Sequence, residues 1–517
     1  MKCASVKFLI LLVLLTPSRS ALLTQGPWIV NSTTNNRVHL KCANWYGAHQ
    51  ELFVPGGLER RSVAHLADHF KNAGINCARI PYSVEMAKYN PQVTREAVAG
   101  IMASDNCTST ATALDVMDCV VKHLKVRGII IILNCHNSYG TWVGAGAQKH
   151  DQGLWNLPGY STEDWVKSME TMAMRYKVDG MDLRNEIHDQ DGVRITWGES
   201  NDVNKDWLAA STLAYDRLYA ADPDILAIVG GLCWNFDLRK MTKHVGPIRA
   251  FDNRKLVYTV HVYPFSFWWL YENNLIYRVL TPIALSFCVL CWALSVTSFV
   301  VLSRSNESKG YKTLRAVSPP AHGWALSLLL AAGSSVYLFS FWLAMSVIYE
   351  NTATSAGCTS MAEDARPYVI GFGVMVALSG LCLLTYAVVV CCYSVMFSCL
   401  RVTAWSTLWL GALFTSIGTV GIYLGNERSY VDYLEHFALN NRPVPVWVGE
   451  FGTGNPSEYM FNFLWKFINE KYNLDFAYWA FNGLKWRNDM WEPETFGLMN
   501  NDYSDWRFHS FFKDLYK

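Results

Sequence analysis

The chain has 517 residues, of which 51% are hydrophobic, and 44 basic and 43 acidic residues give it a formal net charge of +1. A near-neutral chain without a basic run lacks the electrostatic surface that nucleic acids bind, so nucleic acid is not an expected partner. The hydrophobic excess is concentrated between about residues 276 and 424. Both flanks have the composition of ordinary globular protein.

The N-terminus has the pattern of a secretory signal peptide over residues 1–20. Two lysines precede the apolar run Phe8–Leu15, and small residues precede an expected cleavage near Ala21. A membrane anchor is the alternative, but so short an apolar run falls well below the roughly 20 residues that span a bilayer. We therefore expect the mature N-terminal region to be lumenal or extracellular.

That compartment permits two covalent modifications. Asn31 and Asn106 each begin an Asn-X-Ser/Thr sequence, so a glycoprotein is expected. Disulfides are also permitted, and Cys107 with Cys119 could close a loop, although pairing does not follow from sequence.

From about residue 37, short apolar strands alternate with amphipathic helical stretches. Helices are expected at 61–73, 113–125, 162–176 and 204–221. Eight β-then-α units with nearly continuous apolar strands predict an α/β fold, a (β/α)8 TIM barrel with the helices outside. The expected strands are 39–46, 76–82, 128–136, 180–186, 225–232, 255–263, 445–451 and 476–481.

The long gap between the sixth and seventh strands predicts an insertion after strand 6. Four apolar segments occupy it, at about 277–302, 323–349, 368–395 and 403–424, and their cores contain no Asp, Glu, Lys or Arg. Each is long enough to cross a bilayer, and an even number of crossings returns the chain to its starting side. The expected organisation is a signal peptide at 1–20, barrel at 21–274, a four-helix transmembrane insertion at 275–425, and barrel again at 426–517.

Loop charges predict the orientation of this insertion. The segment between the first two spans is basic, and the segment between the second and third is mainly acidic. The positive segment is expected in the cytoplasm, which places the barrel outside the cell or in the lumen of the secretory pathway. Because the cores hold no ionisable acid or base, the spans are expected to anchor the protein in the lipid bilayer rather than transport a solute. Since the insertion follows the end of strand 6, the mouth of the barrel is expected close to the bilayer.

Two stretches place a carboxylate at the end of a predicted buried strand. Val446–Gly452 contains Glu450, and Gly180–Glu186 ends in Glu186. Cleavage of a glycosidic bond needs two such groups, one as acid/base and one opposite it. A structural ion pair is the alternative for either carboxylate alone.

The ordered motifs resemble glycoside hydrolase family 5, the cellulase-type barrels that retain anomeric configuration. The resemblance covers nearly all of the chain outside the signal and the apolar block. It is carried by Asn76–Pro81, Cys135–Asn137, Arg184–Glu186, His261–Tyr263, Gly449–Gly452 and Tyr478–Trp479 on successive predicted strands.

This resemblance implies that Glu186 is the acid/base and Glu450 the nucleophile. Arg79 would hold the nucleophile ionised by lowering its pKa, and Tyr263 would donate a hydrogen bond to it. Asn185 would bind a sugar hydroxyl. The other expected contacts are His136 and His261 around the cleft and the flat apolar face of Trp479 against a sugar ring. No metal or other cofactor is required.

Three functions are compatible with these residues. The first is a membrane-anchored retaining glycosidase acting on cellulose-like or related β-glucans. The second applies the same chemistry to a glycolipid head group, and the third is an inactive glycan-binding or sensing protein. No obligate protein partner is evident. The sugar and its linkage do not follow from the sequence.

Overall fold

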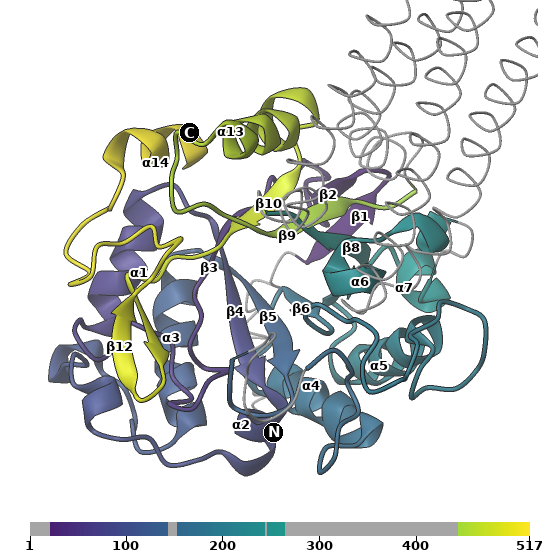
Figure 1. Cartoon of the computed structure of the whole chain (residues 1–517), viewed down its shortest axis with the longest axis horizontal. Helices are drawn as coiled ribbons and strands as arrows, with labels where there is room; N and C mark the ends of the chain where they lie inside the picture. Colours follow the sequence, from purple (N-terminus) through teal and green to yellow (C-terminus); the bar gives the residue numbers. More distant parts are fainter. Residues whose placement is uncertain (1–20, 143–151, 243–245, 264–442, 517) are drawn as a thin grey trace, which may run out of the picture.

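The computed structural model describes residues 21–142, 152–242, 246–263 and 443–516. Eight parallel strands close into a barrel in the order β10-β3-β4-β5-β6-β7-β8-β9 (Figure 1). The predicted barrel is therefore confirmed, with each strand at its expected place in the chain. The strands are β3 Lys41–Asn44, β4 Cys77–Ser83, β5 Ile130–Asn137, β6 Gly180–Asp182, β7 Leu226–Gly230, β8 Leu256–His261, β9 Val446–Phe451 and β10 Asp475–Tyr478.

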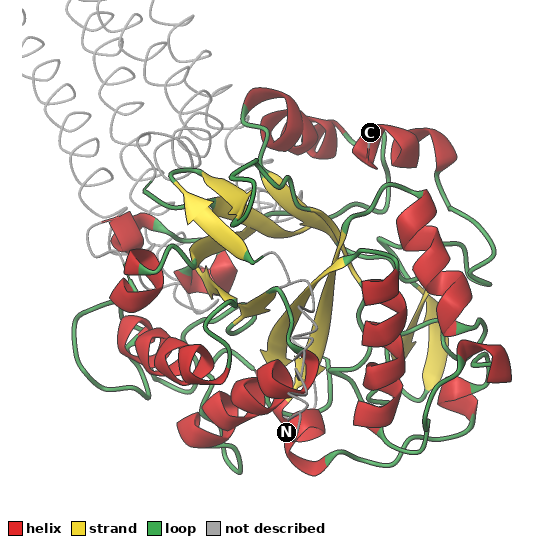
Figure 2. Ribbon diagram, turned by 180° about the vertical axis from the view of Figure 1, so that it is seen from behind, coloured by secondary structure: helices red, strands yellow, loops and turns green. Residues whose placement is uncertain are grey.

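Helices surround the strands, as Figure 2 shows. The α-helices are α1 Val63–Asn72, α2 Val84–Tyr89, α3 Ala113–Val126, α4 Thr162–Tyr176, α5 Trp207–Ala221, α6 Leu232–Asn235, α7 Ile248–Asp252, α13 Tyr459–Trp465 and α14 His509–Tyr516. Short 3₁₀ helices lie at Glu96–Val98, Ala103–Asp105 and Arg239–Thr242, and a π-helix at Lys466–Lys471 continues α13.

Capping residues set where the predicted helices begin. The helix α4 starts at Thr162, as predicted, because the side chains of Ser161 and Asp164 each accept a backbone N–H from the other in a capping box. The helix α5 starts at Trp207 rather than at residue 204, because the carboxylate of Asp206 accepts the N–H groups of Leu208 and Ala209.

Two hairpins were not predicted. The strands β1 Leu22–Gln25 and β2 Trp28–Asn31 pair with each other, as do β11 Leu484–Arg487 and β12 Met490–Pro493. Both are too short to show a clear alternation of apolar and polar residues. Leu22 and Ile29 of the first hairpin join the apolar cluster of the barrel interior.

The barrel interior changes from apolar to polar along the strands. Cys77 of β4 belongs to the interior apolar cluster, whereas Ala78 and Ile80 belong to the outer one under the helices. Since side chains alternate between the two faces of a strand, Arg79 must also face inward. Asp182 on β6 takes the equivalent position beside it. A layer of polar side chains thus lies closer to the carboxyl ends of the strands than the interior apolar cluster does.

An irregular pairing between β8 and β9 aims the end of β9. Val260 pairs with Val448, but the next residue, His261, pairs with Glu450, so Gly449 is the extra residue. A Cβ on Gly449 would lie 2.3 Å from Thr259 Oγ1, which only glycine avoids. Such bulges redirect the side chains that follow them. The glycine therefore sets the direction of Glu450.

The predicted strand 180–186 is shorter in the structure, where β6 ends at Asp182. Beyond Asp182, the backbone N–H groups of Leu183 and Asn185 still donate to neighbouring strands, and Glu186 has φ 44°, a left-handed conformation outside strand geometry. The other strand boundaries differ from those predicted by a few residues.

Two disulfides link described cysteines. Cys107 pairs with Cys119, as the sequence allowed, and Cys42 pairs with Cys77 across the neighbouring strands β3 and β4.

Within the part of the chain that the structure describes, no helix is long and apolar enough to cross a membrane. The four predicted spans and the signal peptide lie outside the described residues.

Candidate active site

Glu450 lies buried at the end of β9, with 4% of its surface exposed. Arg79 Nη1 donates to its Oε1 at 2.6 Å, and the Tyr263 hydroxyl donates to its Oε2 at 2.8 Å. Each carboxylate oxygen therefore has its own donor. Hydrogen bonds of this kind favour the ionised form and fix the direction of its lone pairs.

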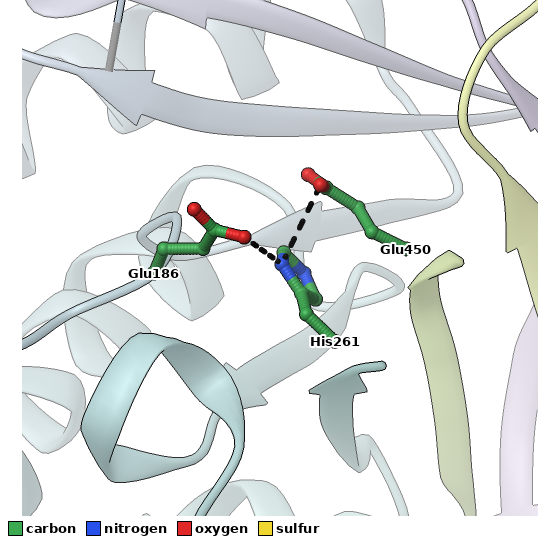
Figure 3. Close-up of side chains that lie close together, drawn as sticks. All are labelled: Glu186, His261 and Glu450. Carbon is green, nitrogen blue, oxygen red and sulfur yellow. Dashed lines mark hydrogen bonds and ion pairs between the residues drawn. The ribbon is translucent and has the colours of Figure 1, made fainter. Parts of the chain in front are cut away.

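Glu186 is held in a different environment. Its side chain is 19% exposed, and no described cation forms an ion pair with it apart from the imidazole of His261. His261 Nδ1 lies 2.9 Å from Glu186 Oε1 and 3.6 Å from Glu450 Oε2. Figure 3 shows the imidazole between the two carboxylates. The structure thus brings together the two acids that the sequence singled out.

The separation of these acids bears on mechanism. The ligand atoms of Glu186, His261 and Glu450 all lie within 4.8 Å of one another. Retaining glycosidases hold their two carboxyl groups roughly 5–5.5 Å apart, whereas inverting ones need about 6.5–9.5 Å to admit a water. The arrangement has the spacing for direct attack by one carboxylate on the sugar.

Arg79 is the centre of the polar layer. Its buried guanidinium donates through Nε to Asp182 Oδ2 at 2.9 Å, and its Nη2 lies in an ion pair with the same oxygen at 2.8 Å, in addition to the bond to Glu450. It also donates to Asn44 Oδ1 at 2.8 Å and Asn185 Oδ1 at 2.9 Å. One cation is therefore shared by two carboxylates and two amides, which fixes its plane.

Arg79 lowers the pKa of Glu450, as expected, but the net pKa of this carboxyl is nevertheless raised. Burial raises the pKa of Glu450, and the opposing effects of His261 and Arg79 do not offset it. Desolvation penalises the charged carboxylate, and the positive charge of Arg79 is partly neutralised by Asp182. Arg79 therefore limits the rise in pKa rather than reversing it.

The pKa values of the surrounding groups set their protonation states. Burial raises the pKa of Glu186 to about 7 and lowers the pKa of His261 to about 3. His261 is thus neutral, and a single proton lies between its Nδ1 atom and Glu186 Oε1. Either Nδ1–H donates to the ionised carboxylate, or the protonated carboxyl donates to the Nδ1 lone pair. Burial also raises the pKa of Tyr263 well above 10, so this hydroxyl remains a donor.

The remaining predicted residues lie around this pair. Asn185 is buried against Arg79, and His136 Nδ1 lies 2.6 Å from Asn134 Oδ1. The ring of Trp479 is 8% exposed and stacks on Tyr46 at 4.8 Å between centroids, with His136 at 5.7 Å. All eight predicted site residues therefore gather at one end of the barrel, although little of the Trp479 ring is open to a ligand.

Sequence reasoning missed several residues of the site. Asn44 and Asp182 are inward-facing polar residues on buried strands, and a strict two-residue alternation from Cys42 and Gly180 would have indicated them. Asn235 gives no such signal. When its amide is oriented to satisfy its neighbours, it accepts the Glu186 N–H at 3.3 Å and donates to Gly231 O at 3.1 Å.

Strained backbone supports the acid at Glu186. Cys233, Trp234 and Asn235 are consecutive left-handed residues, like Glu186 itself, and Cys233 is disulfide-bonded. Trp234 stacks on His188 at 3.5 Å between ring centroids. Non-glycine residues in this conformation cost about 1–3 kcal/mol each, so these contacts must hold the loop in place.

The site also has donor atoms that suit a divalent cation. Two carboxylates and one imidazole are a common ligand set for such ions. The same three residues therefore fit either a glycosidase pair or a metal site, and their surroundings decide between these interpretations. The bonds from Arg79 and Tyr263 already occupy both oxygens of Glu450, which favours the first.

A closed parallel barrel with two close carboxylates at the carboxyl ends of its strands has the architecture of a barrel glycosidase. Residues 38–275 match the family model described as Cellulase (glycosyl hydrolase family 5). The matched region includes Arg79, Asn185, Glu186 and His261, and Glu450 follows it in the chain.

Curated relatives agree with this match. A "Glycosyl hydrolase 5 family protein" of Chamaecyparis obtusa is 32% identical over 279 residues, covering 50% of this chain and 47% of its own length. An "Endoglucanase" of Paenibacillus polymyxa is 28% identical over 216 residues, covering 41% of this chain and 50% of its own length. The chain spans about half the length of the curated relatives that it matches.

Solved structures support the fold. The endocellulase of Pyrococcus horikoshii has a TM-score of 0.53 at 18% identity, covering 96% of this chain and 99% of that one. The catalytic domain of the major endoglucanase of Xanthomonas campestris has a TM-score of 0.53 at 15% identity, covering 96% and 99%. These likenesses show the barrel fold, while the family match and the curated relatives show similarity to glycoside hydrolase family 5 over about half of the chain.

Replacing Asp182 with Asn should shift the acid limb of the pH dependence of kcat/KM to lower pH. Without the second carboxylate, the full charge of Arg79 acts on Glu450 and lowers its pKa. Loss of one partner of a buried ion pair should also cost about 3–5 kcal/mol of unfolding free energy. Activity against pH and denaturant unfolding measure the two effects.

Asp179→Asn is a matched control, because Asp179 precedes the same strand and bonds the backbone N–H of Ile131. It should leave the acid limb in place. An unmoved acid limb in Asp182→Asn would show that Asp182 does not influence Glu450.

Proposed function

We propose that the protein is a membrane-anchored retaining β-glycosidase that uses Glu450 as nucleophile and Glu186 as acid/base. The observation that carries this proposal is the approach of the two carboxylates to within 4.8 Å of each other in contrasting surroundings. Glu450 is bonded by Arg79 and Tyr263, which stabilise an anion. Among the described residues, Glu186 is paired with the neutral imidazole of His261, and its pKa is about 7.

The reaction proceeds in two displacements. An ionised oxygen of Glu450 attacks the anomeric carbon and forms an ester, while Glu186 gives its proton to the departing glycosidic oxygen. In the second step, the ionised Glu186 removes a proton from water, whose oxygen attacks the same carbon and releases Glu450. Both residues return to their initial states.

The surrounding residues stabilise this sequence. Tyr263 and Arg79 hold the two oxygens of Glu450, so that attack requires little reorganisation. Asn185 is fixed by Arg79 beside Glu186, where its amide N–H group can bind a sugar hydroxyl. These contacts support the proposed roles of Glu450 as nucleophile and Glu186 as acid.

The substrate class proposed first is a β-linked glucan or its oligosaccharides. The relatives and solved structures described as endoglucanases or endocellulases support this choice. The predicted spans support attachment to a plasma or secretory membrane with the barrel on the lumenal or extracellular side.

A glycolipid head group is the second candidate substrate. Tyr263, which donates to the nucleophile, directly precedes residue 264, where the described chain breaks and the sequence runs into the predicted membrane insertion. A site so close to a lipid-embedded segment would meet sugars carried on the bilayer surface.

Substituting each acid should separate an enzyme from an inactive binding protein. In Glu450→Gln, hydrolysis of aryl β-glycosides should fall by several orders of magnitude, because no nucleophile remains. In Glu186→Gln, the loss should be about 10²–10⁴-fold on oligosaccharides, which need a protonated leaving group. Activated aryl glycosides should instead give a burst of released phenol.

Glu458→Gln is the control, since this carboxylate follows the same strand but bonds Thr453. It should retain wild-type rates. A wild-type protein without hydrolytic activity, or acid variants as active as wild type, would contradict the enzyme assignment.

The pH dependence should reflect the raised pKa of the acid. Glu186 must be protonated to act, so kcat/KM on oligosaccharides should fall as pH rises through about 7. This alkaline limb should be absent from the burst of activated aryl glycosides, whose departure needs no proton. An alkaline limb at the same pH for both substrates would assign it to another group.

Comparing soluble β-glucan with a glucosylated lipid in vesicles should choose between the two substrates. The full-length protein, reconstituted in the same vesicles, would be assayed against both at equal sugar concentration. A higher kcat/KM for soluble glucan is expected. A clear preference for the lipid would replace the first substrate class with the second.

A further inference from the structure

Two histidines on the outer helix α1 form a cluster that the proposed function does not use. His65 and His69 lie one turn apart, both half-buried, with their Nε2 atoms separated by 3.1 Å. The backbone carbonyl of Tyr503 lies 2.9 Å from His65 Nε2. Three atoms that can each offer a lone pair thus converge, from α1 and from the segment between β12 and α14.

Hydrogen bonds alone cannot satisfy both close contacts of His65 Nε2 at the same time. The carbonyl oxygen of Tyr503 can only accept, so His65 must carry its proton on Nε2 to bond it. His65 Nε2 then has no lone pair for His69. If His69 donates instead, His65 Nε2 must give up its proton and the bond to Tyr503. A well-directed hydrogen bond can therefore form either to the Tyr503 carbonyl or to His69, but not to both at once.

Charged groups of both signs surround this cluster. Burial and the neighbouring His65 lower the pKa of His69, which favours its neutral form. The acidic groups facing it are Asp505 and Asp68, and the basic one is Arg61. Asp68 is paired with Arg127, whereas Asp505 lies on the exposed segment beside Trp506. A carboxylate is therefore close without occupying the cluster.

We propose that His65 and His69 bind a divalent transition-metal ion, with Zn²⁺ as the reference ion and the Tyr503 carbonyl as an additional ligand. Tetrahedral zinc with Zn–N distances of about 2.0–2.1 Å holds two nitrogens about 3.3 Å apart, close to the separation here. Two histidines at i and i+4 on a helix are a known zinc-binding arrangement. Asp505 or water would complete the coordination.

This ion would join two parts of the chain that are distant in sequence. The helix α1 covers the first barrel strands, and Tyr503 packs against Gly57 and bonds the backbone of Leu484. A metal bridge between them would clamp the loops after β10 to the start of the barrel. Its role is structural, and it does not depend on the proposed hydrolysis.

Zinc-dependent stabilisation of the full-length, detergent-solubilised protein tests the proposal. After metal is removed with a chelator, zinc at about 100 times the dissociation constant should raise the Tm by about 5 °C. His69→Gln should lose this rise while keeping the His65 bond to Tyr503, and His65→Gln should lose it too. Competition with a chromophoric chelator should show at least tenfold weaker zinc binding in both variants.

His39→Gln is the matched control, because His39 is also half-buried and lies beside a single carbonyl, that of Leu474 at 2.9 Å. It should keep the zinc response. Wild-type protein without a Tm rise up to millimolar zinc would overturn the proposal. An equal rise in His69→Gln would also overturn it, since zinc would then bind elsewhere, and inhibition of hydrolysis would indicate the catalytic carboxylates. Inactive wild-type protein would contradict only the proposed function.

Discussion

The buried guanidinium of Arg79 is the interaction on which the catalytic end of the barrel depends. It bonds Glu450 on β9, Asp182 on β6, Asn44 on β3 and Asn185 in the segment after β6. A buried cation without such partners would be very costly, and so would the two carboxylates without it. The cation lies beside Glu450, whereas no described cation forms an ion pair of this kind with Glu186, so the two buried acids have different surroundings.

Two neighbouring strands of the barrel, β8 and β9, are far apart in the sequence. The strands β8 and β9 are neighbours in the sheet, pairing Tyr258 with Val446, although most of the residues between them belong to the predicted insertion. The entropy cost of closing a loop grows only slowly with its length, so a long insertion between paired strands is tolerated. The predicted insertion at 275–425 lies between Tyr263 and Glu450 in the sequence. The pairing of β8 with β9 therefore brings Glu450 beside His261 despite this long separation in the sequence.

Sequence predicted the repeating features of the molecule and missed those that depend on three-dimensional contacts. Apolar runs gave all eight strands, and motifs at strand ends gave Glu186 and Glu450. The bulge at Gly449 was not predicted, because it arises from crowding against Thr259 on the neighbouring strand. The lowering effect of Arg79 on the pKa of Glu450 was predicted, but the larger effect of burial was not, since neither that burial nor the sharing of Arg79 with Asp182 is visible in one strand.

Trapping the covalent intermediate tests the central claim most directly. A β-glycoside with fluorine beside the anomeric carbon and an activated leaving group should form the ester but hydrolyse it slowly. Peptide mass analysis of the full-length protein should then find one sugar attached to Glu450, and none in Glu450→Gln. A label on any other residue, or stoichiometric turnover without a label, would contradict a double displacement through Glu450.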